Sequence, residues 1–499
     1  MILDNRQYIQ TILPLRLEWE PWYYTDCNVG IGSRIRVKFA GREYVAVVSA
    51  LADNPQISPE KVQPAIGLAQ GLEPISEAEL KLWRFIAEYY LCTVGEVYKT
   101  AYPAAKQNVE ARKARKKAQT RLDGTVIESE ISFEKNKPLL VKGTRRDSIY
   151  KPLISKVLKQ GRDVLFLKPD APAHSYTELR DIAAEVRRSD SPAQLIIGRK
   201  QLLFLPYSKL GLIIVDEEQD PGYKQSSPAP RYNGRDVAIM LAGIHDAAVV
   251  LGSSCPSLES VQNAQSGKFK MIETGQGPQR EPEFIDTTAE KRKRGMDGNF
   301  SFKLKEAMKE ALDAKEHILL LQPWSDTRDA EIEARALFPQ ARTRLKLSSL
   351  SKADNMEKYG LVALLNADFL FTRQDFRSDE RALQKLTRLQ QECPCRLIIQ
   401  GSEIESRMAD LNVGRLLRER KDFNLPPFSR MVEVVVSDSN EARRAKMTGI
   451  LSKEFGSLQI FLPKNRSLAA AKTELASRLA GIEAAYKYTG HIHLDVDPL

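Results

Sequence analysis

Four short runs of apolar residues, with helical stretches between several of them, limit most strongly what this chain can fold into. Strands that are apolar at successive positions, without alternation, are buried on both faces of a sheet and are typical of parallel sheets covered by helices. The runs are 164–167, 194–197, 210–215 and 249–251. They predict a parallel α/β layer that begins after Pro138.

Polar residues follow two of these runs. Asp216, Glu217 and Glu218 come after the third run, and Gly252 and Ser253 come after the fourth. Ligands in open α/β sheets bind at the carboxyl ends of the strands, so this edge is the predicted site. An apolar strand that ends in Asp-Glu is the Walker B pattern, whose carboxylates hold Mg²⁺ and orient an attacking water. The alternative is an acidic cap where a strand meets a loop.

The first hundred residues show the other kind of strand, in which apolar and polar residues alternate. Residues 33–39 and 43–48 follow this pattern on either side of a short turn at 40–42, which is a hairpin signal. A helical pattern covers 77–90, and Ser76 precedes it as a candidate N-cap. We therefore expect a small β-rich N-terminal domain that is closed by a helix.

The charge of the chain favours a polyanionic partner. The net charge is +10. The length of 499 residues predicts two to four domains. Residues 106–121 hold seven basic residues and one acid, Glu110, with no apolar residue larger than Val109. No core can form there, so this stretch is interpreted either as a solvated helical linker or as an arm that follows phosphates.

The composition predicts a cytoplasmic protein without membrane contact. No apolar run approaches the length of a membrane span, and the N-terminus lacks the pattern of a secretory signal. The five cysteines are scattered along the chain, which suits a reducing compartment.

Several segments together resemble a known family. The residues after the third apolar run resemble, in order, the DEEH box, the aromatic-rich loop and the GSATPSLES box of the PriA family of replication-restart DNA helicases. Other segments resemble the family's marks near both ends, so the resemblance covers most of the chain. The segments are 12–15, 34–37, 88–97, 211–220, 223–225, 230–236, 251–260, 419–420, 425–430 and 494–498.

The resemblance implies an α/β protein of several domains. We expect a small β-rich N-terminal domain that binds a DNA 3′ end, two RecA-like helicase lobes of which the second is reduced, and a small α+β C-terminal domain. The expected bounds are 1–105 for the N-terminal domain, 106–137 for a basic linker, 138–285 for lobe 1, 286–299 for a linker, 300–410 for lobe 2 and 411–499 for the C-terminal domain.

The phosphate loop departs from the family pattern. Counted back from Ile149-Tyr150, the GxxxxGKT loop falls on 140–147. Leu140 and Arg145 stand at glycine positions, Arg146 at the lysine and Asp147 at the Ser/Thr, and the nearest polar and flexible positions are Gly143 and Thr144. Because glycines admit phosphate and the lysine neutralises it, a degenerate nucleotide site is predicted, which binds ATP and Mg²⁺ only if it still functions.

The second lobe lacks further family features. Residues 361–368 resemble the family's LNAD segment, but its GTQM and QVAGRAGR boxes are not recognisable at 348–355 and 386–393. The family carries a cysteine-rich zinc module in this lobe, whereas no cysteine lies between 322 and 338. Cys393-Pro394-Cys395 is the only close pair and lacks two further ligands, so we expect no metal site.

Two segments are predicted to contact DNA. In the family, the residues that match Trp22, Tyr23 and Tyr24 recognise a nascent 3′ end, and Arg34 lies in a strand that matches the same domain. Aromatic rings there could stack on a terminal base, although a hydrophobic cluster in a small β domain is an equal alternative. The aromatic-rich loop combines rings with cations, as single-strand binding requires. Its predicted contacts are Tyr223, Lys224, Arg231 and Tyr232.

Two functions follow from the resemblance. The first is an ATP-independent DNA-binding protein of replication restart and primosome assembly, which recognises forked, branched or single-stranded DNA and recruits primosome and restart proteins. The alternative is an active ATP-dependent 3′→5′ superfamily 2 helicase with an unusual nucleotide site. Leu140, Arg145 and Asp147 favour the first function, and the acids at 216–218 favour the second.

Overall fold

The computed structural model describes residues 6–103, 137–275, 281–341, 343–353, 355–372 and 375–499. The basic stretch expected as a linker at 106–137 therefore lies outside the described residues, except for Lys137. Within the described residues, no helix combines the length and the apolar character needed to cross a membrane.

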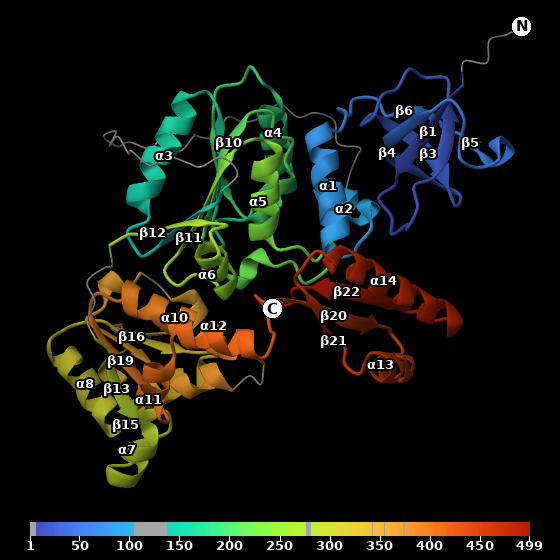
Figure 1. The fold of residues 1–499 in the computed structure, drawn as a ribbon. Coiled ribbons are helices and arrows are strands. Elements are labelled where there is room, and N and C mark those ends of the chain that lie inside the picture. The colour runs from blue at the N-terminus through green and yellow to red at the C-terminus, as the bar shows by residue number, and fades with distance from the viewer. Residues whose placement is uncertain (1–5, 104–136, 276–280, 342, 354, 373–374) are drawn as a thin grey trace, which may run out of the picture.

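The N-terminal sheet has six strands in the order β5-β2-β1-β4-β3-β6 (Figure 1). The strands are β1 (Gln7–Ile12), β2 (Trp22–Thr25), β3 (Arg34–Phe39), β4 (Arg42–Ala52), β5 (Gln63–Pro64) and β6 (Gly67–Leu68). The predicted hairpin forms from β3 and β4, which pair antiparallel with Lys38 opposite Glu43. Ala40 and Gly41 both have positive φ, as a tight turn between twisted strands requires.

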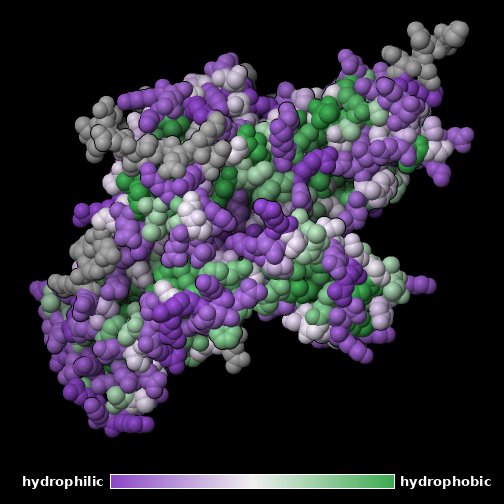
Figure 2. Space-filling model, in the orientation of Figure 1, coloured by the Kyte–Doolittle hydropathy of each residue, from purple (hydrophilic) through white to green (hydrophobic). Residues whose placement is uncertain are grey.

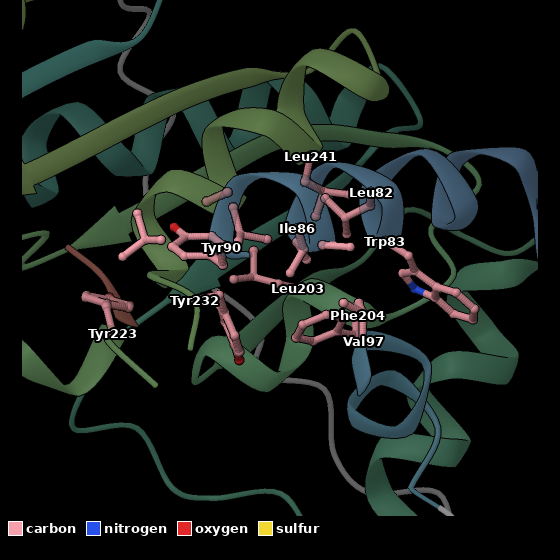
Figure 3. Close-up of a cluster of buried hydrophobic side chains, with 14 of the residues drawn as sticks. Leu82, Trp83, Ile86, Tyr90, Val97, Leu203, Phe204, Tyr223, Tyr232 and Leu241 are labelled. Carbon is pink, nitrogen blue, oxygen red and sulfur yellow. The ribbon is translucent and has the colours of Figure 1, made fainter. Parts of the chain in front are cut away.

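Helix α1 (Glu77–Tyr90) links this sheet to the rest of the molecule. Ser76 caps it as predicted, because its hydroxyl accepts from the Glu79 N–H while the Glu79 carboxylate accepts from the Ser76 N–H at 2.9 Å. Helix α2 (Val94–Ala101) begins with the same kind of capping box. The apolar side of α1 packs into a core shared with the following α/β sheet, as Figure 3 shows for Trp83 and Ile86.

Lobe 1 is built on a six-stranded sheet that is parallel throughout, in the order β12-β7-β11-β10-β8-β9. Its strands are β7 (Leu139–Lys142), β8 (Asp163–Leu167), β9 (Leu195–Gly198), β10 (Leu210–Asp216), β11 (Ala248–Ser253) and β12 (Lys270–Glu273). Its helices are α3 (Asp147–Lys159), α4 (Tyr176–Arg187), α5 (Gly234–Ile244) and α6 (Leu258–Gln265). The four apolar runs are β8, β9, β10 and β11, which confirms the predicted parallel layer.

Lobe 2 is a second parallel sheet, in the order β13-β19-β18-β16-β17. Its strands are β13 (Glu283–Asp286), β16 (Ile318–Gln322), β17 (Leu345–Ser349), β18 (Leu361–Leu364) and β19 (Arg396–Gly401), with a hairpin of β14 (Met296–Asp297) and β15 (Phe300–Ser301). Its helices are α7 (Thr287–Lys293), α8 (Phe302–Asp313), α9 (Arg328–Leu337), α10 (Ser378–Glu392), α11 (Ile404–Asp410) and α12 (Val413–Asp422).

Two expected boundaries need correction. The residues expected as a linker, 286–299, contain the end of β13, α7 and the strand β14, and they belong to lobe 2 because β13 pairs with β19. Helix α12 was expected in the C-terminal domain, yet Leu416 and Leu417 are buried in the core of lobe 2. Short apolar segments carry no signal for the sheet that they join, so these boundaries required the tertiary contacts.

The C-terminal sheet is antiparallel, in the order β21-β20-β22. It comprises β20 (Ser429–Ser437), β21 (Gln459–Pro463) and β22 (His491–Val496), with α13 (Glu441–Phe455) and α14 (Leu468–Ala485). The predicted fold class is thus confirmed: a β-rich N-terminal part, two parallel α/β layers and a small α+β part. The C-terminal sheet lies below α1 in Figure 1, and α1 contacts β22.

Candidate nucleotide site and DNA interface

The connection between β7 and α3 is the place where a phosphate loop belongs. It consists of residues 143–146 only, because β7 ends at Lys142 and α3 begins at Asp147. Leu140 lies inside β7 and is fully buried. The prediction that Leu140 occupies a loop position is therefore wrong. Helix α3 begins at Asp147, whose carboxylate is placed at the helix N-terminus, where an anion is favoured. Four residues are half of the eight-residue loop that wraps phosphates in P-loop proteins.

Arg146 turns from this loop toward the end of β10. Its Nε donates to Asp216 Oδ1 at 2.8 Å, and a second nitrogen donates to Glu217 Oε1. A third contact runs from Nη1 to the Gly143 carbonyl at 2.6 Å. The side chain is only 11% exposed. The structure thus brings the predicted residues of both motifs together, but as an internal ion-pair cluster.

Tyr150 completes the enclosure of Asp216. Its hydroxyl donates to Asp216 Oδ1 at 2.9 Å. The ring requires a glycine at position 252, because a Cβ there would lie 1.6 Å from the Tyr150 oxygen. The predicted box residues Gly252 and Ser253 therefore serve packing: Ser253 is buried, and its hydroxyl accepts from the Cys255 N–H at 2.9 Å.

Glu218 points to a different set of partners. Its carboxylate accepts from Arg235 at 3.0 Å and from the Ser257 N–H at 2.7 Å. Ser257 is the N-cap of α6, so Glu218 joins the starts of α5 and α6 to the end of β10. The three consecutive acids of the predicted Walker B pattern are all engaged by protein groups.

The electrostatics follow from burial. Burial raises the pKa of Glu217, and the Arg146 charge opposes this shift only in part. Burial alone would lower the pKa of Arg146, but the carboxylates of Glu217 and Asp216 outweigh it and raise the pKa above its usual value. The shift of the Arg146 pKa shows that the charged guanidinium is stabilised by these two carboxylates.

These residues do not fit a nucleotide with its Mg²⁺. The loop is short, the carboxylates that would hold Mg²⁺ are paired with Arg146, and Asp147 stands where a phosphate would be attracted. Arg388 of α10, the candidate in this lobe for an arginine finger, pairs with Glu392 at 2.9 Å, and its charge also acts on Glu217. The described residues contain no cluster of three or more His, Cys, Asp or Glu suited to a metal ion.

The aromatic-rich loop lies in the interior, contrary to its predicted contact with DNA. Tyr223 is 1% exposed, and its hydroxyl donates to the carbonyls of Leu167 at 3.0 Å and Asp216 at 2.7 Å. Tyr232 is equally buried and packs edge-on against Phe204, with 5.2 Å between ring centroids. Figure 3 shows both rings within the core that α1 and lobe 1 share.

Lys224 fastens this loop to the C-terminal sheet. Its ammonium is 2.6 Å from Asp495 Oδ1 and donates to the carbonyls of Arg231 and Val496, each at 2.7 Å. Arg231 is half-buried beside it. The prediction that Tyr223, Lys224 and Tyr232 contact DNA is therefore corrected. Their rings are buried in the core, and the Lys224 charge is paired across the contact between lobe 1 and the C-terminal sheet.

The predicted N-terminal contacts separate into two groups. Tyr23 is 3% exposed and donates its hydroxyl to the Lys38 carbonyl at 3.1 Å, and Arg34 is buried with its guanidinium 3.9 Å from the centre of the Tyr102 ring. Both are structural, which corrects their predicted role in DNA contact. Trp22 and Tyr24 are half-buried and lie on the opposite face of β2, because successive strand residues alternate.

Trp22 borders a pocket of about 610 Å³ that the sequence did not indicate. The pocket lies where the loop between β1 and β2 approaches the start of α2. Trp19, Glu20 and Arg84 also line it, and Arg84 pairs with Glu20 at 3.0 Å. Trp19 is 59% exposed. The sequence Glu18-Trp19-Glu20 was the available signal of an exposed ring, because an aromatic residue between two acids is not typical of a core strand.

Comparison with solved structures gave matches of low similarity. RecG bound to a three-way DNA junction gives a TM-score of 0.30 at 10% identity, covering 58% of this chain and 40% of RecG. The Hef helicase domain of Pyrococcus furiosus gives a TM-score of 0.31 at 11% identity, covering 56% of this chain and 94% of that domain.

The sequence comparisons are more specific. Residues 13–103 match the PriA family described as 3′DNA-binding domain (3′BD). The replication restart protein PriA of Rickettsia conorii is 24% identical over 611 aligned residues, covering 93% of this chain and 90% of that protein. The alignment is longer than this chain, so the relative carries segments without a counterpart here.

A shorter match is closer in sequence. The replication restart protein PriA of Chlamydia pneumoniae is 36% identical over 149 residues, covering 26% of this chain and 20% of that protein. The domain match at one end and the similarity along most of the chain show that this protein is similar to the PriA replication restart proteins.

Proposed function

We propose that this protein binds DNA in replication restart and primosome assembly, and that it does so without ATP-driven unwinding. One observation carries the second half of the proposal: Arg146 pairs with Asp216 and Glu217, the carboxylates that an ATPase needs for Mg²⁺ and water. Opening this cluster would leave two buried carboxylates facing a triphosphate. Replication restart and primosome proteins are the proposed partners, in the cytoplasm.

The pocket beside Trp22 is the proposed DNA contact. Two indole rings, the half-buried Trp22 and the exposed Trp19, offer faces on which a terminal base can stack. Such stacking is worth about 1–3 kcal/mol per base. Glu20 pairs with Arg84, and Glu18 adds a second acid to the lining, so the pocket suits a base more than a phosphate. Carboxylate oxygens accept hydrogen bonds from base amino groups. The domain match at 13–103 supports recognition of a 3′ end, at a fork, at a branch or on a single strand.

ATP hydrolysis measured with and without forked DNA tests the first part. We expect phosphate release at the level of the protein-free control in both conditions. The alternative, an active 3′→5′ helicase, requires DNA-stimulated turnover that disappears in Glu217→Gln. That result would overturn the proposal.

Binding of a labelled fork with a free 3′ end tests the second part. We expect salt-sensitive binding that Trp22→Ala weakens by about 5- to 150-fold, the affinity equivalent of one stacked base. Tyr486→Ala removes a ring that is 56% exposed on the C-terminal part and is the matched control, expected to bind as the wild type does. Equal affinities of wild type and Trp22→Ala would remove this pocket from the DNA interface.

A further inference from the structure

A concentrated positive charge lies at the end of lobe 2, away from the N-terminal pocket. Residues 287–309, which span α7, the β14–β15 hairpin and the start of α8, contain seven basic and three acidic residues. Their net charge of +4 compares with +10 for the entire chain. In Figure 1 this region lies at the end of the molecule opposite the N-terminal sheet, and Figure 2 shows its surface in the purple of hydrophilic residues.

The three acids of this region are already engaged. Glu290 is buried and accepts from the Lys303 N–H at 3.2 Å. Asp297 pairs with Lys305, and Glu306 lies 3.5 Å from Arg294.

Five cations remain for an external partner. They are exposed, and none of them forms a salt bridge with another residue that the structure describes: Lys291, Arg292, Lys293, Lys303 and Lys309. Three of the five are consecutive, in the last turn of α7. A polyanion that binds these cations would release the solvent ions associated with them.

An aromatic ring stands among these cations. Phe302 is 41% exposed at the first position of α8, although large apolar side chains are usually covered. Arg294 lies 5.6 Å and Lys305 5.7 Å from the centre of its ring. Protein sites for single-stranded nucleic acid combine aromatic rings with cations, because the phosphates contact the cations and the bases stack on the rings. An acidic peptide would use the cations but has no base to stack.

We infer that this surface, called the lobe 2 basic patch (Lys291, Arg292, Lys293, Arg294, Phe302 and Lys303), is a second binding site for single-stranded DNA. The inference rests on the proposed DNA-binding function and adds to it a contact outside the family-matched residues 13–103. A strand whose 3′ end occupies the N-terminal pocket reaches the patch only if it is long enough, so a long oligonucleotide contacts both sites and a short one held in the pocket does not.

The test compares binding of an oligothymidylate of 8 nucleotides and one of 60 nucleotides across a salt series. In Lys291→Ala/Arg292→Ala/Lys293→Ala we expect the slope of log affinity against log salt for the long oligonucleotide to fall by about 2, since each single-strand phosphate contact contributes about 0.7. Phe302→Ala weakens the same complex by about 5-fold or more at unchanged slope. Both variants bind the short oligonucleotide as the wild type does, whereas Trp22→Ala weakens it.

The matched control is Arg443→Ala/Arg444→Ala/Lys446→Ala, which removes the same charge from exposed residues of α13, two of which pair with acids. This control keeps the wild-type slope. If the patch variant behaves like the control while the wild type binds DNA, the inference fails and the proposed function stands. Displacement of the long oligonucleotide by polyglutamate at equal charge also overturns it, because the patch would then accept any polyanion. A wild-type protein that binds neither oligonucleotide contradicts the proposed function itself.

Discussion

Arg146 and Asp216 form an ion pair at the end of the lobe 1 sheet, with 2.8 Å between Nε and Oδ1, although 70 residues separate them in the chain. The same guanidinium also binds Glu217. One cation thus pairs with two carboxylates that are 13% and 9% exposed. This cluster is a structural contact between the connection that precedes α3 and the end of β10.

Arg146→Ala is expected to lower the free energy of unfolding by about 3–5 kcal/mol, because it leaves Asp216 and Glu217 buried without a counter-charge. Urea unfolding followed by circular dichroism measures this loss. The triple variant Arg146→Met/Asp216→Asn/Glu217→Gln removes all three charges and is expected to recover most of the stability. A triple variant as unstable as Arg146→Ala would contradict the electrostatic explanation.

Arg146→Lys/Asp147→Thr restores the lysine and hydroxyl of a phosphate loop, yet we expect no ATP hydrolysis from it. The connection between β7 and α3 still has four residues, too few to surround a triphosphate. The measurement is phosphate release with forked DNA present. Activity in this variant would show that side-chain chemistry, and not loop length, prevents turnover.

Tyr223→Phe tests the structural role of the aromatic-rich loop. The hydroxyl binds two buried carbonyls, so its loss is expected to cost about 1–3 kcal/mol of unfolding free energy, while the affinity for forked DNA stays unchanged. Tyr176→Phe is the matched control, since that ring is 46% exposed, and it should change neither quantity. A loss of DNA affinity in Tyr223→Phe without a loss of stability would restore the predicted DNA contact.

Glu380 links the two lobes through a buried contact. Its carboxylate accepts from the Leu258 N–H of lobe 1 at 3.0 Å and pairs with Arg420 at 3.0 Å. Glu380→Ala leaves the Arg420 charge buried without this partner and is expected to cost about 3–5 kcal/mol. Glu392→Ala, on the same helix, breaks only an exposed pair with Arg388 and is expected to cost less than about 1 kcal/mol. Thermal unfolding of both variants distinguishes the two costs.

Lys472 predicts a dependence of stability on alkaline pH. It is buried, and its ammonium donates to the carbonyls of Glu88 and Tyr89 at the end of α1. Burial, followed by the nearby charge of Arg430, lowers the pKa of Lys472 to about 8. The folded protein therefore releases this proton near pH 8, whereas the unfolded chain holds it to about pH 10.4.

The unfolded state binds more protons than the folded state between pH 8 and 10. The contribution of Lys472 to stability therefore rises as the pH increases from 8 to 10 and is lost as the pH falls from 10 to 8. The rise is at most about 1.4 kcal/mol per pH unit. Lys472→Met lacks it, so the stability of wild type relative to this variant should grow between pH 8 and 10 in urea unfolding. A constant difference would mean that the pKa of Lys472 is not lowered.

Local patterns predicted the elements of this protein well. The apolar runs became β8, β9, β10 and β11, the alternating segments became the β3–β4 hairpin, and Ser76 capped α1. These features depend on residues within a few positions of one another. The order of the motifs also led to the PriA relatives, because a resemblance in sequence needs no coordinates.

Partners that are distant in the chain were decided by the tertiary structure alone. An alternation of aromatic and basic residues reads the same whether it faces solvent or a core, and only the packing of α1 and β22 against Tyr232 and Lys224 buried the aromatic-rich loop. The sequence determined that Arg146 replaces a lysine and that three acids end a buried strand. It could not show that Arg146 pairs with two of those acids, because an ion pair depends on the distance between side chains in space and not on their separation along the chain.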